Sequence, residues 1–193
     1  ALTPSVLGAT VHVANSQDWV DVYSVLLRSS LDEERGFFVN SQSIAVLLDV
    51  ISTDDTVYLH ESATPMIQHL GTQLASLGYS VVLEQPETNF NYDLAPKDTD
   101  TYYLISLDNP KISSSVAALA AKENAWVYVV DKENIENILD ATRNAKEIVA
   151  VGNFARDIEL QLQPRVDTWI NNNNVFADSE EIAERFGVDK NVV

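Results

Sequence analysis

The same order of apolar and polar segments occurs twice in this chain, about 91 positions apart. Residues 12–14 (His-Val-Ala) are followed by a polar turn and a helical stretch, and so are residues 103–105 (Tyr-Leu-Ile). The next apolar run recurs at the same spacing, since residues 56–59 are matched by residues 147–150. Self-similarity at a fixed spacing indicates a duplicated structural unit. Such a module without an obvious catalytic cluster is more typical of binding or assembly than of catalysis.

Within each half, short β-rich runs alternate with amphipathic helical runs, a pattern typical of a parallel α/β sheet. The predicted strands cover residues 11–14, 36–40, 56–60, 80–84, 102–107, 126–130, 147–151 and 165–170. The predicted helices cover residues 18–31, 43–51, 65–77, 113–123, 132–143, 155–161 and 179–186. We therefore predict an α/β fold of two tandem parallel-sheet modules from an internal duplication. Each module is expected to have three layers, with helices on both faces of its sheet.

The expected division places the first α/β repeat at residues 1–86 and the second at 102–193, with room for further chain beyond. Residues 87–101 are rich in Pro, Asn, Asp and Thr, which is typical of a linker.

Charge and composition exclude several classes of protein. The chain has 29 acidic and 12 basic residues, so its net charge of -17 disfavours nucleic acid and anionic membrane surfaces as partners. No apolar run approaches the roughly 20 residues that span a bilayer. The absence of cysteine excludes disulfides and thiolate metal sites. Such acidity suits a saline exterior, where salt screens self-repulsion.

Several segments together resemble the type 2 cell-wall-binding repeat of bacterial and archaeal surface-layer (S-layer) proteins. Residues 13–24 are similar to the family's first strand, polar turn and helix start, and residues 36–40 to its second strand. Residues 57–59, with Leu70, Leu74, Leu77 and Gly78, are similar to the third strand and its helix. Residues 176–183 resemble the segment that links one repeat to the next.

This resemblance implies a non-enzymatic structural domain at the cell surface, which acts in lattice assembly or in envelope attachment. It implies an extracellular location and, as partners, other copies of the chain or an envelope polymer. The chain departs from the family pattern because it lacks an Arg before the aromatic residue of the linking segment.

The alternative is a small-molecule-binding or enzymatic α/β domain that uses the cleft at the carboxyl ends of the strands. That cleft is expected to collect polar side chains that follow predicted strands, namely Asn15, Ser16, Asp18, His60, Glu61 and Asp108. No glycine-rich phosphate loop and no Gly-x-Ser-x-Gly nucleophile motif is present in the sequence. We therefore predict no catalytic residues.

Acidic loops give the only candidate cofactor, Ca²⁺, which prefers carboxylate ligands. The candidate ligands are Asp54, Asp55, Asp98 and Asp100, whose spacing does not match an EF-hand loop. His60, Glu61 and His69 have ligand chemistry but no spacing that makes them converge.

Overall fold

The computed structural model describes residues 8–185 and 187, and it divides the chain into two compact units between Ala95 and Pro96. The elements of unit 1 are β1 (Thr10–Asn15), α1 (Trp19–Leu31), β2 (Arg35–Phe38), α2 (Ile44–Val50), β3 (Thr56–Glu61), α3 (Leu70–Ser76), β4 (Ser80–Glu84) and α4 (Phe90–Asp93). Those of unit 2 are β5 (Thr101–Ser106), the 3-10 helix η1 (Pro110–Ile112), α5 (Ser113–Glu123), β6 (Trp126–Val130), α6 (Ile135–Ala141), β7 (Glu147–Val151), α7 (Arg156–Leu162), β8 (Thr168–Ile170) and α8 (Val175–Arg185).

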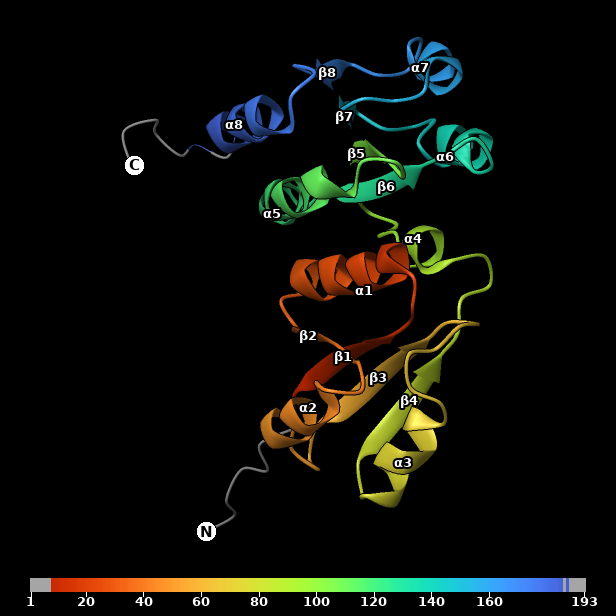
Figure 1. Ribbon diagram of the computed structural model, residues 1–193, viewed down its shortest axis with the longest axis vertical. Helices are drawn as coiled ribbons and strands as arrows, with labels where there is room; N and C mark the ends of the chain where they lie inside the picture. The colour runs from red at the N-terminus through yellow and green to blue at the C-terminus, as the bar shows by residue number, and fades with distance from the viewer. Residues whose placement is uncertain (1–7, 186, 188–193) are drawn as a thin grey trace. The chain divides into compact units, whose positions relative to one another are not determined.

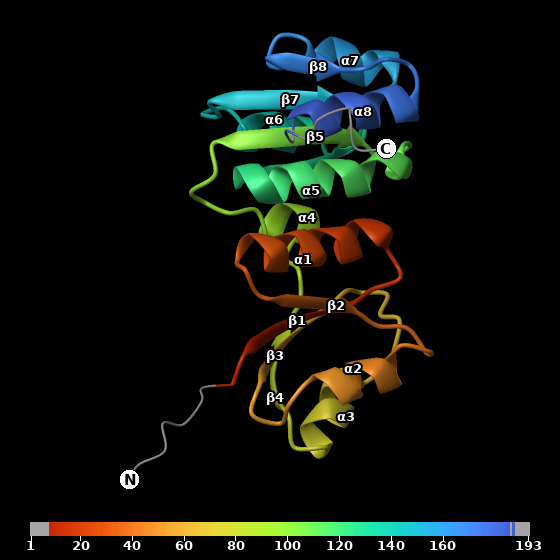
Figure 2. The ribbon, with the colours of Figure 1, turned by 90° about the vertical axis from the view of Figure 1, so that its left-hand side faces the viewer.

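Each unit contains a four-stranded parallel sheet with helices between its strands (Figure 1). The strand order is β2-β1-β3-β4 in unit 1 and β6-β5-β7-β8 in unit 2. In unit 1, α1 and α4 cover one face of the sheet, and α2 and α3 cover the other (Figure 2). The predicted α/β class with two similar modules is confirmed.

The two units share their framework residue for residue over most of their length. Thr10 and Thr101 begin β1 and β5, and Ile44 and Ile135 begin α2 and α6, at the predicted spacing. The turn before α2 is also repeated. Asn40 Oδ1 accepts hydrogen bonds from two backbone amides ahead of α2, as Asp131 Oδ1 does ahead of α6. These matches are what an internal duplication predicts.

The main core of unit 1 lies between the sheet and the pair α2 and α3. Strand side chains alternate between the two faces, so every second residue of β1 and β3 points toward these helices. The fully buried members of this core include Val11, Val13, Leu47, Val57, Leu59, Leu70 and Leu74. The opposite face has a much smaller apolar cluster, formed by Ala14, Val25 and Phe90. Polar side chains occupy the rest of that face, as described below.

The three largest differences from the sequence prediction concern α4, α3 and α8. The expected linker contains α4, which packs on α1 and belongs to unit 1. The helix expected at 65–77 begins only at Leu70, because His69 adopts a left-handed conformation with φ of 58°. The last helix begins at Val175 and not near Ser179, and Asn174 Oδ1 accepts from the amide of Phe176 at its start. Its expected end, residue 186, lies outside the described residues.

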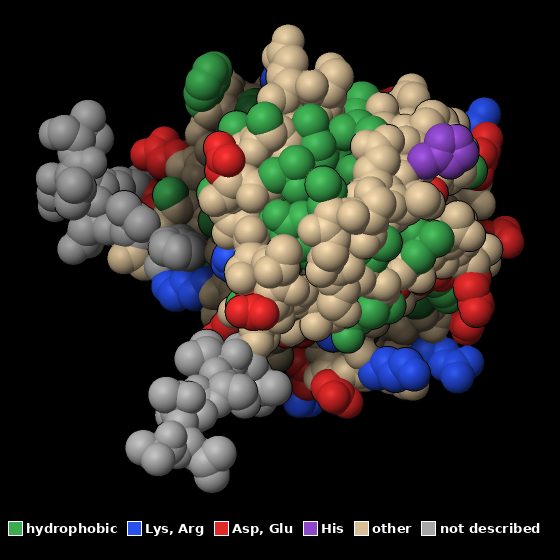
Figure 3. Space-filling model, turned by 90° about the horizontal axis from the view of Figure 1, so that it is seen from below, with side chains coloured by type: hydrophobic (Ala, Val, Ile, Leu, Met, Phe, Trp, Pro, Cys, Tyr) green, Lys and Arg blue, Asp and Glu red, His purple; other side chains and the backbone are tan. Residues whose placement is uncertain are grey.

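Unit 1 leaves apolar side chains exposed on the side of α2 and α3. Figure 3 views this side and shows hydrophobic side chains near its middle, with most charged side chains toward its edge. The exposed apolar residues on this side include Val46 and Val50 of α2, Leu77 directly after α3, and Leu83 of the adjacent edge strand β4. No helix in the described part of the chain is both long and apolar enough to cross a membrane.

Gly36 sets how closely α1 approaches β2. A Cβ atom at this position would lie 2.1 Å from Ser29 Oγ and 3.1 Å from Ser29 Cβ. We predict that Gly36→Ala lowers the free energy of unfolding by about 1–3 kcal/mol, as overpacking does. Urea denaturation followed by circular dichroism measures this change. Ser29→Ala removes the nearest atom, so the double variant should recover part of the loss. An unchanged stability of Gly36→Ala would contradict the close packing.

Candidate functional site

Asn15 lies at the carboxyl edge of the unit 1 sheet, where it contacts Glu61, another of the predicted cleft residues. Its side chain is fully buried, and its Nδ2 donates to Glu61 Oε2 at 3.0 Å and to the Ile67 carbonyl at 2.8 Å. Its Oδ1 accepts from the Ile67 amide at 2.9 Å. The amide group of Asn15 therefore serves to anchor the loop between β3 and α3.

Ser16 and Asp18 lie beside each other and begin α1. The Ser16 hydroxyl donates to Asp21 Oδ2 at 2.7 Å and accepts from the Asp18 amide at 3.0 Å. Asp18 Oδ1 accepts from the Val20 amide at 2.8 Å, the bond expected of an N-cap residue. Burial raises the pKa of Asp21 above its ordinary value. These polar groups therefore use their hydrogen bonds within the helix start.

A mostly apolar hollow of about 400 Å³ adjoins this helix start. Ser16 and Asp18 line it together with aromatic and apolar side chains, which include Trp19, Tyr23, Leu26, Phe38 and Met66. Of the remaining predicted cleft residues, His60 points to the α1 and α4 face, and Asp108 belongs to unit 2. The structure thus brings Asn15 to Glu61 and Ser16 to Asp18, and it leaves His60 apart from both pairs.

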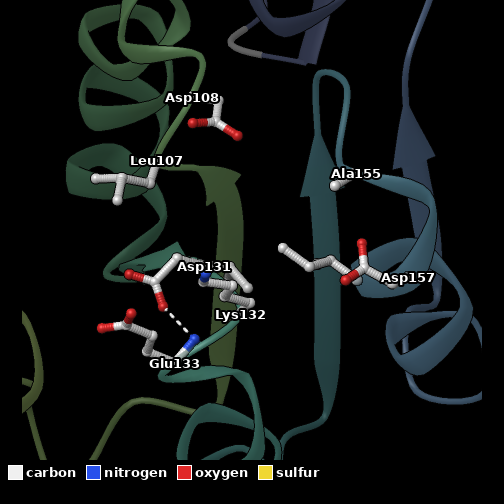
Figure 4. Close-up of a pocket in the computed structure, with 9 residues that line it drawn as sticks. Leu107, Asp108, Asp131, Lys132, Glu133, Ala155 and Asp157 are labelled. Carbon is white, nitrogen blue, oxygen red and sulfur yellow. Dashed lines mark hydrogen bonds between the residues drawn. The ribbon is translucent and has the colours of Figure 1, made fainter.

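Asp108 lines a hollow of about 310 Å³ in unit 2, at the carboxyl ends of β5 and β6 (Figure 4). Parallel α/β sheets commonly bind ligands at this edge. Asp131, Asp157, Lys132 and Glu133 also line the hollow, so acidic side chains outnumber its one base. Asp131 Oδ1 is occupied by the Glu133 and Asn134 amides at 2.7 and 2.9 Å. The lining resembles a solvated acidic cleft more than an anion site.

The four acidic residues expected to hold Ca²⁺ have different surroundings. Asp55 is buried, and its carboxylate accepts from the amides of Ser52 and Ala9 and pairs with Arg35. Asp54, next to it, is exposed. In unit 2, Asp100 pairs with Lys146, and Asp98 is exposed. Asp55 and Asp100 therefore already have cationic partners within their own units.

An unpredicted chain of four polar side chains crosses the α1 and α4 face of unit 1. His12 on β1 and His60 on β3 are both buried, and His12 Nδ1 lies 2.9 Å from His60 Nε2. Glu34 Oε2 is 2.5 Å from His12 Nε2, and Glu84 Oε2 is 3.1 Å from His60 Nδ1. The order Glu34–His12–His60–Glu84 thus runs across the sheet from the start of β2 to the end of β4. We call these four side chains the histidine chain.

The surroundings of the histidine chain are aromatic and tightly packed. The ring of His12 stacks on those of Tyr58 and His60, and Phe90 of α4 meets the His60 ring edge to face. Burial, and secondarily the nearby His12, lowers the pKa of His60 to about 4. His60 is therefore a neutral imidazole at pH 7.

The alternation of β-strand side chains contained a signal for the histidine chain. His12 and His60 alternate with the apolar residues of the predicted strands at 11–14 and 56–60, but the sequence did not predict that these two strands are neighbours. Glu34 and Glu84 lie at strand ends, where sequence alone gives no partner. Asp32 lies close to His12 and Glu34. Within the described residues, one donor atom from each of these three side chains lies within 4.8 Å of the other two. These three side chains have the chemistry of metal ligands.

No protein-family model matches the chain, and a comparison with curated proteins finds no match. A comparison with solved structures finds the crystal structure of ShkA full-length in complex with AMPPNP, at 14% sequence identity. The match covers 96% of this chain and 53% of that chain, with a TM-score of 0.25. A TM-score this low supports no inference about fold or activity.

We predict that Asn15→Ala lowers the free energy of unfolding by about 1–3 kcal/mol, because it leaves the partly buried backbone groups of Ile67 without the Asn15 side chain as their partner. Urea denaturation at pH 7 measures the change. Gln17→Ala is the matched control, since Gln17 is exposed and donates a single bond to the carbonyl of Pro65 at 3.2 Å. Equal effects of the two substitutions would contradict the anchoring role of Asn15.

Asp55 should contribute stability that depends on pH. The hydrogen bond from the Ser52 amide, with further help from Arg35 and Ala9, lowers the pKa of Asp55 below its ordinary value of 3.8. Its contribution is therefore present above about pH 4 and is lost as the pH falls through the lower folded pKa. We expect Asp55→Asn to cost about 1–3 kcal/mol at pH 7, with the difference from wild type shrinking in denaturation series below pH 3.8. Asp54→Asn should show neither effect.

Proposed function

We propose that the chain is a non-enzymatic structural module of a cell-surface layer or envelope protein, and that it acts by associating with further copies of itself. Three features support this proposal: the duplicated α/β framework, the resemblance to cell-wall-binding repeats, and the strongly acidic composition. The polar groups at the carboxyl edge of the unit 1 sheet support it too, because Asn15, Ser16 and Asp18 are occupied by structural hydrogen bonds.

The observation that carries the proposal is the apolar face on α2, α3 and β4 of unit 1. Val46 is 60% exposed, Leu77 is 57% exposed and Leu83 is 53% exposed. Val50 adds to them from the same helix as Val46. Exposed apolar side chains gathered on one side of a domain are typical of an interaction surface, because covering them removes apolar area from water. We call this surface the apolar face.

Charge favours another copy of the chain as the partner at this face. With a net charge of -17, most surfaces of two copies repel each other. The apolar face is an exception, because α3 contains no charged residue and α2 contains only Asp49. Two apolar faces can therefore approach without bringing many carboxylates together. An envelope polymer is the competing partner, and the experiment below separates the two.

A second candidate function rests on the unit 2 hollow beside Asp108. Its position at the carboxyl ends of β5 and β6 favours a small polar ligand, and Asp131, Asp157 and Lys132 line it. Acidic lining of this kind favours cations and hydroxyl-rich compounds over phosphates. Binding of such a ligand would be sensitive to Asp108→Asn and insensitive to changes on the apolar face.

We predict that the protein self-associates reversibly in sedimentation velocity experiments at increasing concentration, and that Val46→Glu weakens association at least about tenfold, or 1.4 kcal/mol. The physical reason is that association would bury an unpaired charge. Leu160→Glu on α7 of unit 2 is the matched control, since Leu160 is 55% exposed and the charge change is the same.

The same series is run with and without Ca²⁺ and with isolated cell-envelope material. Loss of association in Val46→Glu alone supports assembly through the apolar face. Association weakened equally in Leu160→Glu would show a general charge effect and contradict the assignment of the face. A chain that stays monomeric in every condition and does not co-sediment with the envelope material would overturn the proposed function.

A further inference from the structure

When both imidazoles are neutral, the histidine chain has one hydrogen fewer than its three contacts can use. Glu34, His12, His60 and Glu84 make three contacts, and each contact needs a hydrogen or another cation between two acceptor atoms. Two neutral imidazoles supply two hydrogens. His12 Nε2 carries one of them toward Glu34, because two bare acceptors do not lie 2.5 Å apart.

The nitrogen that is left without a hydrogen is His60 Nδ1. When His12 Nε2 donates to Glu34, His12 Nδ1 accepts from His60 Nε2 at 2.9 Å, and His60 Nδ1 is left with a lone pair. That lone pair faces the Glu84 carboxylate at 3.1 Å, and the atom is buried without a hydrogen-bond partner in the described structure. Because His60 is 1% exposed, water does not compensate readily. An unsatisfied buried polar atom of this kind calls for an explanation.

A metal ion on His12 Nε2 removes the shortage, as a third hydrogen on the two imidazoles also would. The ion replaces the hydrogen between His12 and Glu34, so that the His12 hydrogen moves to Nδ1 and donates to His60 Nε2. The His60 hydrogen then lies on Nδ1, 3.1 Å from Glu84 Oε2. Each imidazole nitrogen then carries a hydrogen or the ion, or accepts a hydrogen bond. The resulting order of ion, imidazole, hydrogen-bonded partner and carboxylate is the way proteins commonly support a histidine ligand.

The donor atoms beside His12 are suitably placed and charged. Asp32 and Glu34 each offer a carboxylate oxygen within 4.8 Å of the other two donor atoms of the cluster. Their side chains are each 32% exposed, which leaves a route from solvent. Arg28 binds Asp32 Oδ2 at 2.7 Å, so Oδ1 is the oxygen of Asp32 that faces no such competitor. One imidazole and two carboxylates suit zinc-type ions.

The positions of unit 2 that correspond to His12 and Asp32 carry different side chains. Tyr103 stands at the position of His12, and its hydroxyl donates to Glu123, which stands at the position of Asp32. Arg185 of α8 pairs with Glu147 at 3.0 Å in the same region. The final helix of unit 2 thus supplies a cation. The corresponding helix of unit 1, α4, consists of Phe-Asn-Tyr-Asp and supplies none.

We propose that His12, Asp32 and Glu34 bind one divalent transition-metal ion of the zinc type, with His60 and Glu84 as positioning residues for His12. The ion joins the carboxyl end of α1 to the central strand of the unit 1 sheet. This site is independent of the apolar face, and neither its presence nor its absence decides whether the chain self-associates.

Isothermal titration of the metal-free protein with Zn²⁺ tests the site, and visible absorption of Co²⁺ reports its coordination. We expect one saturable ion per chain. Glu34→Gln and Asp32→Asn, at partly exposed positions, should each lower the affinity at least about tenfold, and His12→Gln should abolish saturable binding. His60→Phe should lower the affinity about 10–100-fold without changing the stoichiometry or the Co²⁺ bands, and His60→Gln should restore part of it.

His69→Gln is the matched control, because the chain has three histidines and His69 is the exposed one outside the histidine chain. Circular dichroism and urea denaturation check that each variant folds. Should His12→Gln fail to fold, the two carboxylate variants decide the question. No saturable binding by the wild type, binding unaffected by Glu34→Gln and Asp32→Asn, or binding lost in His69→Gln would each overturn the proposal.

Discussion

Parallel pairing of β1 with β3 is the constraint on which the packing and the chemistry of unit 1 both depend. The register sets Val11 beside Val57 and Val13 beside Leu59 on one face, where they form the core under α2 and α3. The same register pairs His12 with Tyr58, two residues before His60, and on the other face His12 Nδ1 lies 2.9 Å from His60 Nε2. A shift by one residue would exchange the two faces, placing imidazoles in the apolar core and valines beside Glu34. The core therefore holds the histidine chain in place.

The two units show how one framework accommodates different polar groups. Helices and strands recur at the same spacing, and the Asn40 turn has its counterpart at Asp131. The buried face under the first helix differs, because unit 2 has Tyr103 and Val151 where unit 1 has His12 and His60. Among the described residues, most of the exposed large apolar side chains belong to unit 1, and four of them form the apolar face. Unit 1 thus carries both proposed interactions, while unit 2 preserves the framework with a more completely buried sheet.

The sequence predicted the fold class and most elements because strand alternation and helical periodicity are local properties. It failed where a distant contact decides the outcome. α4 consists of four residues that look like linker, and it becomes a helix by packing Phe90 beneath α1. The loop before α3 stays irregular because Asn15, more than 50 positions away, binds Ile67. The histidine chain depends in the same way on strand register and on two glutamates at strand ends. Alternation places His12 and His60 opposite the apolar residues of their strands, but it does not show that the two rings meet or which partners they have.

The positions of the imidazole hydrogens test the account of unit 1 most directly. Two-dimensional ¹⁵N–¹H correlation spectra distinguish the Nε2–H and Nδ1–H forms of each histidine ring, and are best recorded at about pH 8, where free imidazole is neutral. The account predicts Nε2–H forms for both His12 and His60 in the metal-free protein. It predicts Nδ1–H forms for both rings after one equivalent of Zn²⁺, with His69 unchanged. Nδ1–H forms without metal, or no change on adding Zn²⁺, would contradict it.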